Sequence, residues 1–104
     1  METLFEHINI LVLTKPSQKE DHDFVLPPQI PVLKKARISK NHQLFLIQEP
    51  HHALEAAMRL QHQHPTQSIA LGHGHALCIE DQPNHASYHG DSLHELVQLM
   101  PKLP

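Results

Sequence analysis

Apolar positions recur along the chain with two different spacings, which predict strands and helices in turn. A dense run of β-branched and aliphatic residues within positions 3–14 predicts a central strand that is apolar on both faces near its end. Two shorter apolar runs, Val32–Ser39 and Gln43–Gln48, flank Lys40-Asn41-His42 and predict a β-hairpin, because Asn tolerates the left-handed turn conformation. The second of these runs is apolar at successive positions, so both of its faces should be covered.

Helical spacing begins after Pro50, a residue that favours the first turn of a helix. The segment His51–His64 carries apolar residues three and four positions apart, and Pro65 stops it. The next segment, Ser68–Glu80, alternates large residues with small ones, two glycines among them. This alternation predicts a strand that is bent or bulged at its glycines, with a small-residue face that we expect the preceding helix to approach closely.

The last predicted element is a second helix, which follows a polar loop. Asp91 or Ser92 is expected to cap it, and Ser92 and Glu95 have the spacing of a capping box. Its apolar stripe continues to Met100, and Pro101 ends it.

Between the first strand and the hairpin lies a long segment, Lys15–Pro31, with no predicted helix or strand. It is rich in charged residues, and its three prolines Pro27, Pro28 and Pro31 lack amide donors. So long an irregular stretch is unusual inside a small domain. We expect either a functional arm or a segment that packs on a neighbouring subunit.

The order of elements predicts the fold class. Strand, loop, strand, strand, helix, strand and helix indicate an α+β domain with an antiparallel or mixed sheet and helices on one face. We expect a ferredoxin-like sandwich whose first helix is missing or replaced by the proline-rich arm at 15–31. The alternative is an irregular open sheet completed by dimerisation. With 104 residues, the chain should form a single domain over positions 1–104.

Charge and cysteine content narrow the function classes. The net charge of −3 and the pI near 6.4 argue against a general nucleic-acid-binding protein, which needs a concentrated basic face. The single cysteine, Cys78, cannot form an internal disulfide, and we find no leader-like segment or apolar run of membrane-spanning length. These features predict a soluble, cytoplasmic protein without membrane contact.

Twelve histidines, scattered from His7 to His94, are the compositional anomaly. Two of them, His73 and His75, are the best candidate metal ligands, because residues two apart on a strand project from the same face and can share one Zn²⁺, Ni²⁺ or Cu²⁺ ion. His89, or alternatively His85, could supply the third ligand. Zinc is therefore the candidate cofactor.

Other chemistry is poorly supported. Ser87 has histidines on both sides in sequence, but no Gly-x-Ser-x-Gly elbow frames it. Cys78 falls on the small-residue face of its strand, where a buried, inert thiol is expected.

Three segments between Ile38 and Leu99 together resemble a known family. Gln43–Gln61 (QLFLIQEPHHALEAAMRLQ) is similar to a strand of that family and the Ala-rich helix after it. Ile69–Ile79 (IALGHGHALCI) is similar to its glycine-punctuated strand, and Tyr88–Leu93 (YHGDSL) is similar to the segment before its last helix. In all three the family is the class III nucleotidyl cyclase catalytic domain. The resemblance implies a ferredoxin-like fold that works as a dimer.

The resemblance also implies where catalytic residues would lie, and this chain departs from the family there. Two aspartates of the family hold two magnesium ions on the nucleotide phosphates. Their positions correspond to Leu13-Thr14-Lys15 and to Asn41-His42, where no carboxylate is present. The family's transition-state asparagine and arginine would fall near His94 and Gln98.

These departures favour a non-enzymatic function. We expect a catalytically inactive, shortened cyclase-like module with a binding or regulatory function, acting as a homodimer through sheet edges or the 15–31 arm. A histidine-rich transition-metal-binding protein using His73, His75 and His89 is the alternative.

Overall fold

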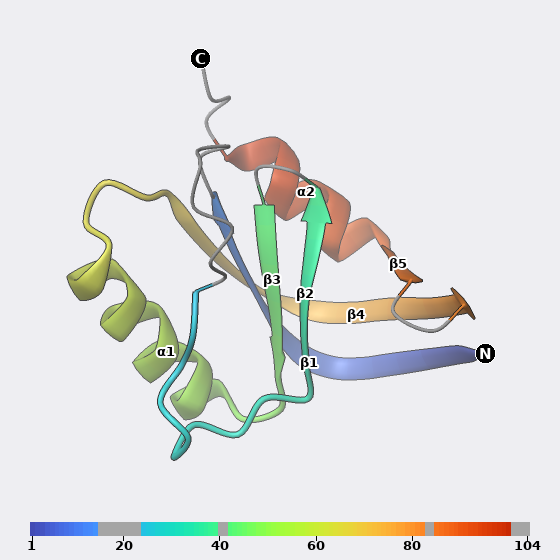
Figure 1. The fold of residues 1–104 in the computed structure, drawn as a ribbon, viewed down its shortest axis with the longest axis horizontal. Coiled ribbons are helices and arrows are strands. Elements are labelled where there is room, and N and C mark those ends of the chain that lie inside the picture. The colour runs from blue at the N-terminus through green and yellow to red at the C-terminus, as the bar shows by residue number, and fades with distance from the viewer. Residues whose placement is uncertain (15–23, 40–41, 83–84, 101–104) are drawn as a thin grey trace.

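The computed structural model describes residues 1–14, 24–39, 42–82 and 85–100. In chain order its elements are β1 (Glu2–Thr14), β2 (Lys34–Ser39), β3 (His42–Ile47), α1 (Pro50–Gln63), β4 (Ile69–Gln82), β5 (His85–His89) and α2 (Asp91–Leu99). The strands form one five-stranded sheet in the order β2-β3-β1-β4-β5, and every neighbouring pair is antiparallel (Figure 1). The predicted α+β class is confirmed.

The sheet is apolar on both faces where β1 lies between β3 and β4. Ile10 and Val12 point to one face together with Leu44 and Leu46 of β3, and they pack with residues of α2. The alternate positions of the same strands point to the other face and pack with α1, the buried set being Leu11, Leu13, Ile30, Phe45, Ile47, Ala53, Ala56 and Leu60. The expectation that both faces of β3 are covered is confirmed.

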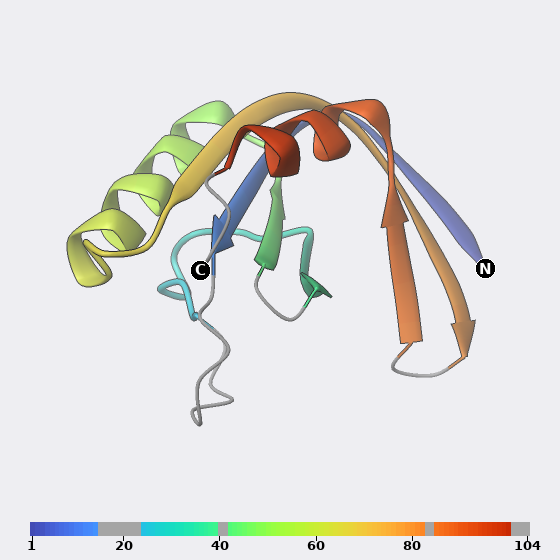
Figure 2. The same ribbon diagram turned by 90° about the horizontal axis from the view of Figure 1, so that it is seen from above.

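The two helices therefore lie on opposite faces of the sheet. The expectation of both helices on one face was wrong, because a sheet that is apolar on both sides needs a cover on each. Figure 2 shows that the sheet is strongly curled, with α1 outside the bend and α2 inside it. We call the side that holds α2 the concave face and the side that holds α1 the convex face.

The curl brings together strands that are not neighbours in the sheet. Lys34 Nζ of β2 lies 3.3 Å from Glu80 Oε1 of β4, although β3 and β1 separate these strands. A register shift between Phe5 and Ile8 interrupts the β1–β4 ladder, and His7 within it has a φ of 53°. Irregularities of this kind bend a strand and increase its twist.

The small-residue face of β4 is covered by α2. A Cβ at Gly72 would lie 3.0 Å from the Leu96 side chain, and a Cβ at Gly74 would overlap the side chain of Ser92. The expectation that the preceding helix would occupy this face was wrong, because α1 lies on the opposite face and this surface is concave.

The segment expected to be a polar loop contains a strand. β5 pairs with β4, with Tyr88 opposite Cys78 and His89 opposite Leu77. Its sequence, HASYH, has little apolar character, since an edge strand with an exposed side does not need it.

The start of α2 also differs from expectation. Gly90, with a φ of 145°, precedes the helix, and neither Asp91 nor Ser92 makes a capping hydrogen bond from its side chain. Ser92 instead faces Gly74.

The second half of the predicted arm packs on its own chain. Ile30 is buried, and the Phe24 N–H donates to Gln43 Oε1 while Gln43 Nε2 donates to the Phe24 carbonyl, both at 2.8 Å. The arm thus satisfies a fully buried glutamine. Residues 24–31 contain no helix or strand, as predicted, and residues 15–23 lie outside the described part of the chain. Neither α1 nor α2 has the length and apolar character of a membrane-crossing helix.

The tight contact between Gly74 and Ser92 gives a prediction about stability. Gly74→Ala should lower the free energy of unfolding by about 1–3 kcal/mol, because its Cβ has to displace helix α2. Gly72→Ala should cost less, since the flexible end of Leu96 can move. Urea unfolding monitored by circular dichroism measures both.

The double variant Gly74→Ala/Ser92→Gly is the control, because it removes the atoms that the new methyl group meets. It should be more stable than Gly74→Ala alone. A Gly74→Ala protein as stable as the wild type would contradict the packing of α2 described above.

Candidate functional site

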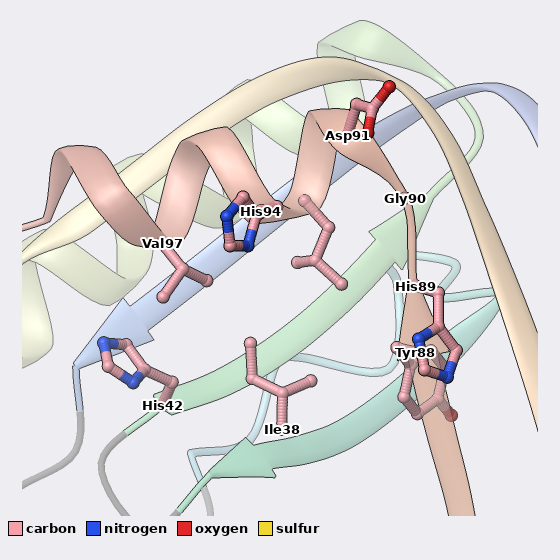
Figure 3. Close-up of a pocket in the computed structure, with 9 residues that line it drawn as sticks. Ile38, His42, Tyr88, His89, Gly90, Asp91, His94 and Val97 are labelled. Atoms are coloured by element: carbon pink, nitrogen blue, oxygen red, sulfur yellow. The ribbon is translucent and has the colours of Figure 1, made fainter.

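A pocket of about 590 Å³ opens on the concave face, between β2 and β3 on one side, β5 on another and α2 above. Figure 3 shows its lining, which consists of Ile38, His42, Tyr88, His89, Gly90, Asp91, Leu93, His94 and Val97. Apolar side chains form part of the wall, while three imidazoles and a phenol supply polar groups. Such a mixture is typical of small-molecule sites.

His42 stands at the start of β3, directly opposite Thr14 at the end of β1. Thr14 is buried, and its Oγ1 accepts a hydrogen bond of 2.9 Å from the Ser68 N–H. The same hydroxyl lies 3.4 Å from Gln67 Oε1 and from the Ser68 carbonyl. Thr14 therefore holds the ends of β1 and β4 together, and His42 is the member of the pair that faces the pocket.

Two pocket groups have shifted pKa values. Burial lowers the pKa of His42 below its ordinary 6.5. Burial also raises the pKa of Tyr88 to about 12, with further contributions from a hydrogen bond and charge interaction with Cys78 and from the charge of Glu80. Both groups are therefore neutral at pH 7, when the imidazole has one donor and one acceptor and the phenol keeps its proton.

The helix contributes a second imidazole. Gln98 Nε2 lies 2.9 Å from His94 Nε2 one turn away, and an amide donor requires this ring nitrogen to be unprotonated. Figure 3 shows His94 on α2 and His42 on β3, on opposite walls of the pocket. The Asp91 carboxylate lies at the start of α2 and points away from the centre of the pocket.

The three predicted metal ligands are only partly brought together. His75 and His89 line a second pocket, of about 490 Å³, together with Glu6 and Leu4. The ring of His73 instead lies 6.4 Å from that of His7, centroid to centroid. Among the described residues, no group of three or more His, Cys, Asp or Glu side chains is arranged to hold a metal ion.

The two candidate nucleophiles lie in ordinary surroundings. Cys78 is buried, as expected, and faces Tyr88 across the β4–β5 pair. Ser87 Oγ lies 2.9 Å from Nε2 of His89, its neighbour on the same side of β5.

Sequence reasoning missed the concave pocket because two of its walls were missing from the expected fold. Tyr88 and His89 line it only because β5 is a strand that the curl turns towards α2. The resemblance to the cyclase family implies catalytic positions at Asn41-His42 and near His94, and His42 and His94 both line the concave pocket.

The lowered pKa of His42 gives a prediction about pH dependence. The unfolded chain takes up a proton at this residue at higher pH than the folded chain does, so the free energy of unfolding should fall as the pH decreases from 6.5 towards the lowered pKa. Below the lowered pKa, His42 causes no further loss. His42→Gln should reduce the difference in urea stability between pH 7.5 and pH 5.5.

His62→Gln, at an exposed position on α1, serves as the control and should keep the wild-type difference. A nuclear magnetic resonance titration in which His42 titrates at or above 6.5 would contradict the prediction.

Searches against protein-family models, curated proteins and solved structures found no match to this chain.

Proposed function

We propose that the chain is a non-catalytic binding or regulatory module, related to the class III nucleotidyl cyclase catalytic domain, that acts as a homodimer. The observation that carries the proposal is the pairing of Thr14 with His42. These residues belong to the two segments, Leu13-Thr14-Lys15 and Asn41-His42, where the resemblance expects magnesium-binding aspartates, and cross-strand pairing places such residues next to each other. Threonine and histidine offer no carboxylate to a hard cation.

The helix α2 supports the same proposal. His94 and Gln98 lie near the positions where the resemblance expects a transition-state asparagine and arginine, and they bond to each other at 2.9 Å. Neither is a permanently charged guanidinium that could stabilise a phosphoryl transition state.

The strand order is a further support. The order β2-β3-β1-β4, with α1 connecting β3 to β4, is compatible with a ferredoxin-like sandwich in which a proline-rich segment replaces the first helix. On this interpretation, β5 and the concave position of α2 are what distinguish the domain from a simple sandwich.

The chemistry of the concave pocket supports a choice of ligand to test. His42 and Tyr88 are neutral at pH 7, and Asp91 places a negative charge at the rim. Such a pocket disfavours a triphosphate and favours an uncharged molecule with a flat apolar part and a few hydrogen-bonding groups. A nucleoside without phosphates is a suitable probe, because imidazoles and a phenol can bond to its base edge while Ile38 and Val97 cover its face.

Incubation with ATP or GTP and Mg²⁺ or Mn²⁺ should yield no cyclic nucleotide.

Adenosine should shift the imidazole resonances of His42 and His94, and MgATP should bind more weakly than adenosine. His94→Ala should weaken adenosine binding by roughly tenfold, because one hydrogen bond and its wall contact are lost. Calorimetry measures both affinities.

His52→Ala on α1, outside both the concave pocket and the groove on the outer side of α1, is the matched control and should bind adenosine like the wild type. Cyclic nucleotide synthesis, or MgATP binding tighter than adenosine binding, would overturn the proposal.

Transition-metal binding is a second candidate function because His75 and His89 line the same pocket as Glu6. If it is the function, calorimetric titration with Zn²⁺ gives a tight site with one ion per chain, and His75→Ala/His89→Ala abolishes it. His51→Ala/His52→Ala, on the first turn of α1, should leave that site unchanged. Weak, non-stoichiometric binding would rule this candidate out.

A further inference from the structure

The outward face of α1 carries two large exposed apolar side chains among its polar residues, where a helix on a sheet normally presents polar residues alone. The face that packs on the sheet consists of Ala53, Ala56 and Leu60. On the opposite side, Leu54 is 56% exposed and Met58 is 62% exposed, one helical turn apart. They lie in a shallow groove of about 650 Å³, which we call the α1 surface, lined by His51, Leu54, Glu55, Met58, Arg59, His62 and Gln63.

The strand edges are less suitable for self-association. β2 forms one edge of the sheet and carries Lys34, Lys35 and Arg37, and positive charges on an edge strand oppose pairing with a second copy of the same edge. β5 forms the other edge and has only five residues. The proposed homodimer therefore needs a different surface.

The charges of the α1 surface are complementary to those of the same surface on a second copy of the chain. Glu55 and Arg59 lie one turn apart along one side of the apolar pair, with Arg59 Nη2 3.7 Å from Glu55 Oε1. If a second α1 packs antiparallel with the two-fold axis level with Ala57, Glu55 of each copy lies opposite Arg59 of the other, because both residues are two positions from the axis. Met58 then lies beside its own symmetry mate, and Leu54 covers the ends.

We propose that two copies of this chain associate through the α1 surface, with the helices antiparallel and Glu55 paired with Arg59 across the two-fold axis. This inference rests on the homodimer of the proposed function and names its surface. It replaces the sheet edges as the site of contact and leaves the concave pocket open on the other face of each sheet.

Sedimentation velocity at tens of micromolar tests the proposal. The wild type should sediment as a dimer, and Leu54→Glu/Met58→Glu should sediment as a monomer with unchanged circular dichroism, because both side chains are exposed in the single chain. Leu4→Glu is the matched control, since Leu4 is 54% exposed on β1 and lies outside the α1 surface. It should remain a dimer.

A charge swap tests the orientation of the two helices. Glu55→Arg should weaken dimerisation by at least about tenfold, because it places like charges opposite each other. The double variant Glu55→Arg/Arg59→Glu should restore the dimer, since it exchanges the charges and keeps them complementary.

The outcomes separate this inference from the function it rests on. A monomeric wild type would overturn both. A dimer that persists in Leu54→Glu/Met58→Glu, or one that dissociates with Leu4→Glu instead, would overturn the α1 surface and leave the homodimer in place. Failure of the charge swap to restore the dimer would overturn the antiparallel arrangement.

Discussion

The apolar character of β1 and β3 on both faces is the constraint on which the rest of the fold depends. Successive buried residues from Ile10 to Leu13 cannot be satisfied by a single layer of helices. One helix must cover each side, so α1 and α2 are separated by the sheet and each buries only a few large side chains. α1 buries Ala53, Ala56 and Leu60 against the sheet, while Leu54 and Met58 face outward.

Hydrophobic spacing identified most of the elements because it is a local property. The bounds of α1 and β1 agree closely with the predicted segments, since α1 carries helical apolar spacing between Pro50 and Pro65 and β1 contains a dense apolar run. β5 lacks such a pattern, because it is an edge strand whose conformation depends on its pairing with β4. The sequence also could not indicate which helix covers which face of the sheet. The glycines in β4 allow any element to approach closely, and the curl of the sheet determines that this element is α2.

The candidate site was predictable only in part, for a related reason. The spacing of His73 and His75 placed both on one strand face, but it could not indicate that His7 lies beside the first while His89 and Glu6 lie near the second. The absence of carboxylates at Thr14 and His42 could be seen in the sequence, whereas their cross-strand pairing required the register. The proposed function thus depends on the missing carboxylates, which the sequence shows, and on the cross-strand pairing, which only the structure shows. The proposed dimer contact changes neither.

The bending of the sheet has a consequence for how the concave pocket holds a ligand. Its walls come from opposite margins of a single sheet, and β5 is attached on one side only. Local unfolding of β5 removes one wall of the concave pocket while the central strands stay folded. Its free energy is lower than that of global unfolding. A ligand bound there, as proposed above, would contact both margins, and its binding would be linked by mass action to the ordering of the last strand. Ligand binding and local rigidity would then increase together, which would give the proposed regulatory module a way to report binding without catalysis.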